Sequence, residues 1–590
     1  MLKNKSETYF VIGIIALWIM CVAIVNPSGN FPLNDDWAYG KPIKSFIEKG
    51  RFEFTSWPSM TLIGQLLLGL LVTKIFGFSF TVLRLLTLCC GMISVLYSYF
   101  ILKKVSNSAS LSALFTLGIF FNPIFFSLSF TFMTDVPFYC FCCLCIFYNL
   151  EYFEKRDSLS LVLGTLFSVI AVLIRQPAIV ISLSFFIAVV AGKFVKKRHG
   201  WFYMLQFIIT LTILMFYEKQ VKFALGYSRG FTNANMDFLK MFFSDPKTHL
   251  FRFASVALSV PLYLGLFALY AAPFITPLSQ KGTINLKRLF AMILAGIATG
   301  TIFLFVFESQ GRRFPFSVGN IISNFGLGPV LISSQGLFSP PPLFWQILTV
   351  LGIASFVIIV TVIIAYLKNA YVEKTKLNRL TLWFPLVCIL LYVPTVSVIS
   401  FMDRYLIIPV LLLSMIIVLV IRDREPLEPY SRKRYFISAL LLVPSVFISL
   451  LGTKDYLSWN RARWEGLNYL TGDLKLSPYK IEGGVEFDTW YKYSNPPSPF
   501  DKNAVWWVGD DIEYGVSFSP KENCEVLKSI PYQRFLPLRR ERILVLKREN
   551  RAPDENLSAA RTAFSANRQH LFSQCGADAP VSGIVPNLPE

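Results

Sequence analysis

Long runs of apolar residues recur along the first 451 positions, and short polar or basic segments separate them. Each run approaches the roughly 20 residues that a helix needs to cross the apolar core of a bilayer. The pattern therefore predicts a mainly α-helical, polytopic transmembrane bundle of about 13 spans. The predicted spans are 9–26, 82–102, 109–127, 136–152, 158–174, 177–192, 201–217, 251–271, 289–307, 343–366, 380–399, 405–421 and 435–451.

The apolar run 61–76 is ambiguous, because two glycines, a glutamine and a lysine interrupt it. The basic residues decide its assignment, since Lys and Arg concentrate in cytoplasmic loops. If 61–76 lies flat at the membrane interface, basic clusters fall in alternate loops, whereas a further crossing would invert every later loop. We therefore predict an interfacial helix at 61–76 and a cytoplasmic N-terminus. The segments predicted to face outward are 27–81, 128–135, 218–250, 308–342, 400–404 and everything after 451.

The composition changes after residue 451, which divides the chain into three predicted regions. Residues 1–451 form the membrane domain, and its outer loop 27–81 carries juxtamembrane helices. The segment 452–551 opens with an aromatic amphipathic helix and closes with the strand-like run 542–548, which predicts a small α+β domain outside the cytoplasm. The hydrophobic pattern fades in 552–590, which predicts a disordered tail.

Composition and charge also indicate that lipid is the main solvent of the chain. Apolar residues make up 54% and charged residues 16%, whereas a soluble domain carries roughly a quarter charged residues. The net charge of +20 lies mainly in short loops between apolar runs, which favours membrane topology and lipid contact over nucleic-acid binding. The sequence contains no phosphate-binding or dinucleotide-binding glycine motif, and its three histidines lie far apart. Nucleotide-dependent and histidine-based metal chemistry are therefore disfavoured.

Two acidic motifs fall in segments predicted to face the same side of the membrane. Asp35 and Asp36 lie in the first outer loop, and Asp135 precedes the span that begins at 136. Adjacent acids oppose each other's ionisation, so one can keep a raised pKa while the other orients a nucleophile or a metal. Each motif also suits a simple helix N-cap. The topology, which rests on Lys and Arg alone, brings both motifs to one face and favours a shared site.

Several arginines predicted on that same side are candidates for binding phosphate. They are Arg175, the pair Arg312 and Arg313, and Arg404. A guanidinium group matches phosphate oxygens with two parallel hydrogen bonds, and an arginine near the membrane interface is costly unless it is paired. Two structural alternatives stay open: Arg404 pairs only with the adjacent Asp403, or Arg175 is a snorkelling residue in a helical hairpin.

Five motifs in this order resemble lipid-linked-sugar glycosyltransferases of the GT-C fold, specifically the family 39-like group of protein mannosyltransferases and lipid A aminoarabinose transferase. The resemblance covers most of residues 1–500, and the stretches 458–464 and 481–487 look like the soluble end of bacterial members. The first loop carries Asp-Asp where the protein mannosyltransferases carry Asp-Glu. The motifs are Asp35-Asp36-Trp37-Ala38-Tyr39, Thr134-Asp135-Val136-Pro137, Arg175-Gln176-Pro177, Asp403-Arg404-Tyr405-Leu406 with Pro409, and the stretches 458–464 and 481–487.

The resemblance implies a membrane glycosyltransferase that moves a hexosyl or pentosyl group, with inversion, from a polyprenyl-phosphate sugar to an acceptor hydroxyl outside the cytoplasm. Asp35 or Asp36 would be the general base, and Asp135 would position the acceptor or the base, or hold a divalent metal ion. No other cofactor is implied. The acceptor would be a glycan, a lipid or a protein, and the location a bacterial inner membrane. The implied donor-binding residues are Tyr39, Arg175, Arg313 and Arg404.

Two other functions fit the same topology. A transporter or flippase of a lipid-linked sugar would also use many spans and basic outer loops, but transporters usually show inverted repeats and polar residues near the midplane, and neither is evident. A noncatalytic membrane scaffold that displays the segment 452–551 would explain the topology. It would not explain why the acidic motifs gather on one face.

Overall fold

The computed structural model describes residues 5–55, 57–192, 197–225, 259–275, 286–308, 313–315, 321–369, 376–397, 402–424, 430–493 and 512–549. The predicted tail 552–590, Arg312 and part of the predicted span 251–271 lie outside the described residues.

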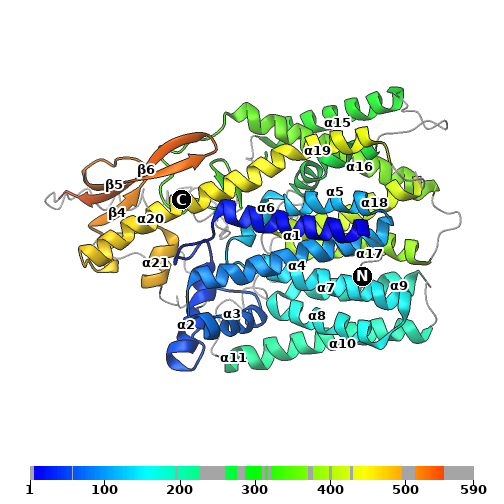
Figure 1. The fold of residues 1–590 in the computed structure, drawn as a ribbon, viewed down its shortest axis with the longest axis horizontal. Helices are drawn as coiled ribbons and strands as arrows, with labels where there is room; N and C mark the ends of the chain where they lie inside the picture. The colour runs from blue at the N-terminus through cyan, green and yellow to red at the C-terminus, as the bar shows by residue number, and fades with distance from the viewer. Residues whose placement is uncertain are drawn as a thin grey trace, which may run out of the picture.

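Helices dominate the described residues, and a small sheet lies near the C-terminal end of the chain, so the predicted mainly α-helical class is confirmed (Figure 1). The helices are α1 (Lys5–Val25), α2 (Asp36–Lys49), α3 (Ile63–Phe76), α4 (Phe80–Ser106), α5 (Ala109–Phe120), α6 (Pro123–Ser129), α7 (Asp135–Lys155), α8 (Ser158–Ile174), α9 (Ile179–Ala191), α10 (Lys197–Phe216), α11 (Lys222–Ala224), α14 (Ala272–Ile275), α15 (Leu286–Phe307), α16 (Pro342–Asn369), α17 (Lys376–Ser397), α18 (Ile407–Arg424), α19 (Arg432–Phe447), α20 (Thr453–Asn468) and α21 (Val485–Lys492).

Within the described residues, nine helices are long and apolar enough to cross a membrane, and each coincides with a predicted span. The chain is therefore an integral membrane protein. The predicted spans 158–174 and 177–192 are present as shorter apolar helices. The run 61–76 forms α3, whose 14 residues extend about 21 Å, less than the apolar thickness of a bilayer.

The predicted span 109–127 differs from a straight helix. It consists of α5 and α6, which meet at a bend of 66°. The sequence at the bend explains the break, because the side chain of Asn122 accepts hydrogen bonds from the amides of Ile124 and Phe125 and so caps a new helix. Pro123 then occupies the first position of that helix, where its missing N–H carries no penalty.

The change in composition at residue 452 falls inside one helical rod. A π-helical turn, Ile448–Gly452, joins α19 to α20, and the rod continues to Asp473 over 42 residues. Polar residues therefore begin where the rod leaves the membrane, with no break in the backbone. The α20 part of the rod packs against a sheet whose strand order is β3-β4-β6-β5. The strands are β3 (Ile481–Glu482), β4 (Tyr514–Ser517), β5 (Cys524–Phe535) and β6 (Leu538–Arg548).

The long hairpin β5–β6 is antiparallel from Cys524 opposite Arg548 to Phe535 opposite Leu538 at its turn. A second, very short hairpin pairs β1 (Ile322–Ser323) with β2 (Gly326–Leu327) between α15 and α16. In Figure 1, α2, α20, α21 and the sheet gather at the same end of the bundle. This arrangement agrees with the predicted topology, in which the first loop and the segment after residue 451 share one side of the membrane.

Candidate functional site

Asp35 lies immediately before α2, but its side chain makes no capping hydrogen bond. Its Oδ1 instead accepts a hydrogen bond of 3.0 Å from the indole N–H of Trp57. Its Oδ2 lies 3.6 Å from Nη1 of Arg404. Burial raises the pKa of Asp35, and Arg404 and the Trp57 hydrogen bond oppose that rise. The side chain is therefore held in an electrostatic cluster, and the helix-cap alternative does not describe its contacts.

Asp36 has a different role, because backbone amides occupy both of its oxygens. Oδ2 accepts from the amide of Leu33 at 3.2 Å, and Oδ1 accepts from the amide of Phe132 at 2.8 Å. The residue is fully buried, and burial raises its pKa to about 8 against the opposing effect of Arg84. Asp36 thus ties the first loop to the loop before α7, which carries Asp135.

Asp135 is the first residue of α7 and is buried at the meeting point of two arginines. Its Oδ1 forms a close ion pair with Nη1 of Arg175 and lies 3.9 Å from Nε of Arg404. Its Oδ2 is buried and finds no hydrogen-bond partner among the described residues. A buried acceptor without a partner is costly, which marks this oxygen as a candidate contact for a ligand hydroxyl.

Arg175 and Arg404 both lie at the end or the beginning of a helix. Arg175 follows α8 in an extended conformation, and Arg404 lies in the 3-10 turn Asp403–Leu406 that leads into α18. Both guanidinium groups lie over the ring of Tyr405, at 4.9 and 5.8 Å from its centre. Two like charges so close together require compensating negative charge, which Asp35 and Asp135 supply.

The alternative in which Arg404 pairs only with Asp403 does not describe these contacts. The carboxylate of Asp403 accepts hydrogen bonds of 2.9 Å from the backbone amides of Ile321 and Ile322, at the start of β1. Asp403 therefore holds the segment before α16 in place, and Arg404 reaches the carboxylates of Asp35 and Asp135.

Tyr39 lies in the first turn of α2, four residues after Asp35, and is fully buried. Burial raises the pKa of its phenol well above the ordinary value, and the nearby charges include Asp35 and Arg404. The hydroxyl stays protonated at neutral pH and is therefore a hydrogen-bond donor at the edge of the cluster.

Arg313, the remaining predicted donor-binding residue, is not brought to the cluster. Its Nη1 pairs with Oε1 of Glu308 at 3.3 Å, and the same oxygen accepts a hydrogen bond from Gln346. No contact within the described ranges joins Arg313 to Asp35 or Asp135. Its role in phosphate binding stays a prediction.

The sequence did not single out the residues that fasten the first loop to the C-terminal region. Oε1 of Glu486, in α21, accepts a hydrogen bond of 3.2 Å from the amide of Asn34. Oε2 of Glu486 pairs with Arg463 of α20 at 2.9 Å, and both side chains are fully buried. Both residues fall in the stretches that carried the resemblance, but no spacing rule assigns them a role. Only the fold brings them beside Asp35.

Further contacts along the same boundary attach the first loop to α21 and α4. Lys41 of α2 donates a 2.8 Å hydrogen bond to the carbonyl oxygen of Thr489 in α21, and burial lowers its pKa to about 8. Trp37 packs on Tyr493 with ring centres 5.0 Å apart. At the start of the same loop, Arg84 of α4 donates hydrogen bonds to three carbonyl oxygens of residues 27–31.

The cluster suits a ligand that carries both a phosphate and a hydroxyl group. Two guanidinium groups face the site, and each retains donors that the carboxylates do not use. Among the described residues, no group of three His, Cys, Asp or Glu side chains gathers that could hold a metal ion. The divalent ion at Asp135 stays a prediction, and such an ion would compete with Arg175 and Arg404 for the carboxylate.

Comparison with known proteins gives one sequence family. Residues 64–216 match the family described as dolichyl-phosphate-mannose-protein mannosyltransferase. The resemblance to this group is therefore confirmed for a part of the chain that includes Asp135 and Arg175. No curated protein sequence matches the chain significantly.

Among solved structures, several are distantly similar to most of the chain. The apo structure of ArnT from Cupriavidus metallidurans is 12% identical, with 91% of this chain and 98% of that chain covered and a TM-score of 0.42. ArnT from the same organism bound to undecaprenyl phosphate is 11% identical, with 91% and 97% covered and a TM-score of 0.37. The Archaeoglobus fulgidus oligosaccharyltransferase complex with Zn and sulfate is 11% identical, with 85% and 67% covered and a TM-score of 0.35.

Proposed function

From the family match over residues 64–216 and the acid–arginine cluster, we propose that this protein is a GT-C-type membrane glycosyltransferase. It transfers a sugar from a polyprenyl-phosphate donor to an acceptor hydroxyl on the outer side of a bacterial inner membrane. One observation carries the proposal: Asp35, Asp135, Arg175 and Arg404, from four distant segments, converge in one buried cluster. The acceptor is a glycan, a lipid or a protein.

Asp35 is the better candidate for the general base, because its contacts leave it less enclosed than Asp36. Both oxygens of Asp36 accept backbone amides, and the residue is fully buried, whereas the side chain of Asp35 keeps 16% of its surface exposed. Oδ2 of Asp35 is held only by an ion pair of 3.6 Å. Its raised pKa also makes it a stronger base than an exposed aspartate.

In the proposed reaction, the proton and the leaving group each have a defined destination. Asp35 takes the proton of the acceptor hydroxyl, the oxygen attacks the anomeric carbon from the face opposite the phosphate, and the bond from that carbon to the phosphate oxygen breaks. The electron pair leaves with the polyprenyl phosphate, and the configuration inverts. Arg175 and Arg404 stabilise the charge that grows on the departing phosphate. The free oxygen of Asp135 orients the acceptor hydroxyl, and Tyr39 donates to a donor oxygen.

The proposal is tested by incubating the purified protein with a panel of polyprenyl-phosphate sugars and acceptors and measuring the release of polyprenyl phosphate. Release that depends on both sugar and acceptor supports transfer. A folded protein that releases no polyprenyl phosphate from any donor, but moves a lipid-linked sugar across vesicle membranes, would make the transporter function correct instead.

In the same assay, Arg404→Gln is expected to lower kcat by about a hundredfold or more, because a preorganised donor to the developing charge is lost. Arg313→Gln is the comparison with the same change of charge. Its partner Glu308 lies outside the cluster, so it is expected to keep near wild-type kcat. Equal losses in both variants would indicate that the phosphate site extends to Arg313.

Trp57→Phe is expected to shift the acidic limb of the pH–rate profile to higher pH by about one unit. The indole N–H stabilises the carboxylate of Asp35 and lowers its pKa, so its removal raises the pKa by an amount typical of a hydrogen bond to a charged group. Activity is then lost at a higher pH as the solution is acidified. The profile of kcat/KM against pH measures this shift.

Trp37→Phe is the matched control, since the indole N–H of Trp37 has no hydrogen-bond partner among the described residues. Its acidic limb is expected to stay at the wild-type pH. An unchanged profile for Trp57→Phe would argue against Asp35 as the titrating base.

A further inference from the structure

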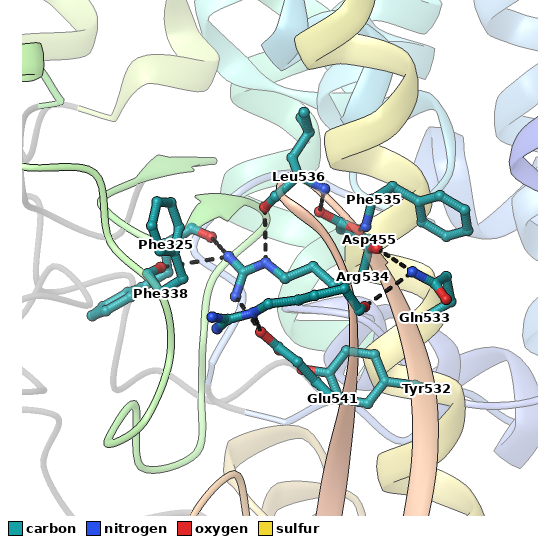
Figure 2. A network of polar contacts seen from close by, with 10 residues as sticks. Phe325, Phe338, Asp455, Tyr532, Gln533, Arg534, Phe535, Leu536 and Glu541 are labelled. Atoms are coloured by element: carbon teal, nitrogen blue, oxygen red, sulfur yellow. Dashed lines mark hydrogen bonds and ion pairs between the residues drawn. The ribbon is translucent and has the colours of Figure 1, made fainter.

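The turn of the β5–β6 hairpin lies beside the point where the chain leaves the membrane. The carboxylate of Asp455, near the start of α20, accepts hydrogen bonds from the amides of Phe535 and Leu536 (Figure 2). Asp455 is four residues beyond Leu451, the last residue of the predicted span, or about 6 Å further along the rod. The headgroup layer on each side of a bilayer is roughly 5–8 Å thick. With the membrane boundary taken at Leu451, the turn is at the level of the lipid headgroups.

A second tether fixes the same depth from another helix. The guanidinium group of Arg534 donates to the carbonyl oxygens of Phe325 and Phe338, in the segment that leads into α16 (Figure 2). The first residues of α16 carry exposed apolar side chains, with Leu343 exposed by 63% and Phe344 by 41%. Such side chains at the start of a membrane span face lipid. Two independent attachments thus hold the hairpin turn against the membrane surface.

The turn presents an apolar side chain surrounded by positive charge. Leu538 is exposed by 76% and lies at the start of β6. It is followed by the exposed side chains of Arg539, Arg540 and Arg542. An exposed leucine beside arginines is the combination that peripheral segments use to bind anionic membranes.

The acidic residues near the turn do not cancel this charge, because each is committed to contacts within the protein. Asp455 accepts the backbone amides of the turn. Glu541 pairs with Arg534 and Arg539 and accepts the hydroxyl of Tyr532. Arg540 and Arg542 form no ion pair with any described residue. Positive charge is therefore left facing outward.

We propose that the β5–β6 turn is a membrane-docking surface, in which Leu538 enters the lipid layer and Arg540 and Arg542 bind the phosphates of anionic phospholipids. Each basic residue near an anionic surface contributes a free energy that corresponds to about fivefold in affinity. Docking would fix the C-terminal sheet over the bundle, and it is independent of which sugar the protein transfers.

Contact with lipid is tested by placing the photoreactive residue benzoylphenylalanine at Leu538 of the full chain, reconstituted in nanodiscs that contain phosphatidylglycerol. The control places it at Val526, which is also exposed and lies nine residues along β5 from the turn, or about 30 Å away. A lipid adduct is expected at position 538 and not at 526. The proposal fails if position 538 yields no lipid adduct or if both positions yield it equally.

The preference for anionic lipid is tested by native mass spectrometry of the full chain titrated with phosphatidylglycerol. The double variant Arg540→Gln with Arg542→Gln is expected to bind phosphatidylglycerol about 25-fold more weakly at this site, at about fivefold for each arginine. It keeps Arg534 and Glu541, so both tethers remain.

The matched control is Lys547→Gln with Arg548→Gln, which removes two exposed charges from the far end of the same strand. It is expected to bind phosphatidylglycerol like the wild type. Equal weakening in both double variants would overturn the proposal, as would equal binding of phosphatidylcholine or displacement of the lipid by inorganic phosphate at the same concentration.

Discussion

Replacing Asp35 with asparagine is expected to slow sugar transfer by about a thousandfold while the protein remains folded. A positioned general base contributes roughly 10²–10⁴-fold to a rate, and an amide cannot take its place. The change is otherwise small, because the amide oxygen of asparagine can still accept the hydrogen bond from Trp57. The single-turnover rate of polyprenyl phosphate release measures the effect, and donor binding measured separately is expected to change little.

Two further variants distinguish the loss of the general base from a disturbance of the structure of the first loop. Glu53→Gln removes another carboxylate of the first loop, which forms surface ion pairs with Lys49 and Arg51, and it is expected to be fully active. Asp36→Asn turns an amide N–H₂ toward one of two backbone amides, so it is expected to lower stability by about 1–3 kcal/mol. If Asp35→Asn were active and Asp36→Asn folded but inactive, the base would have to be reassigned to Asp36.

Much of the fold was predictable from the sequence, because the bilayer imposes a length on each apolar run. The nine long spans follow from that constraint. The basic loops predicted that the first loop and the C-terminal region share one side, and the two regions lie at one end of the bundle (Figure 1). The structure shows two features of the helices that the length of an apolar run does not reveal. Asn122 and Pro123 break one predicted span into α5 and α6, and Gly452 lies inside a continuous helical rod.

The candidate site was predictable in part. Arg175 and Arg404 stood out because an arginine near the membrane interface needs a partner. Asp35 and Asp135 stood out because the predicted topology put both acidic motifs on one face, and the fold brings these residues together. Arg313 carried the same signal but is paired with a neighbour in its own segment. Sequence spacing could not distinguish the two cases, since the partner of a charge depends on which loops meet in space.

The sequence also could not predict the different roles of Asp35 and Asp36. The two residues are adjacent and chemically identical, and either one suited the base or the cap. Their environments differ because Leu33 and Phe132 direct backbone amides at Asp36. A tryptophan side chain and Arg404 face Asp35 instead. Backbone amides leave no signal in a sequence.

Glu486→Ala is expected to lower the free energy of unfolding by about 3–5 kcal/mol, because it leaves the guanidinium group of Arg463 buried without its counter-charge. Both side chains are fully buried and pair at 2.9 Å. The midpoint of thermal unfolding, followed by intrinsic fluorescence, measures the loss. Glu513→Gln is the control, because it breaks the exposed pair with Lys480 in the same region, and exposed pairs contribute only about 0–1 kcal/mol.

A double variant, Arg463→Met with Glu486→Leu, distinguishes a stabilising role from a positioning role. Replacing both members of a buried ion pair by apolar residues is often neutral for stability, so the midpoint is expected to return toward that of the wild type. The amide of Asn34 still loses its acceptor, and the adjacent Asp35 is then free to move. We therefore expect the double variant to be stable but to have a lower kcat. A double variant that is both stable and fully active would limit the pair to supporting the fold. A stable variant with low kcat would mean that the C-terminal region holds the first loop in the geometry that transfer requires.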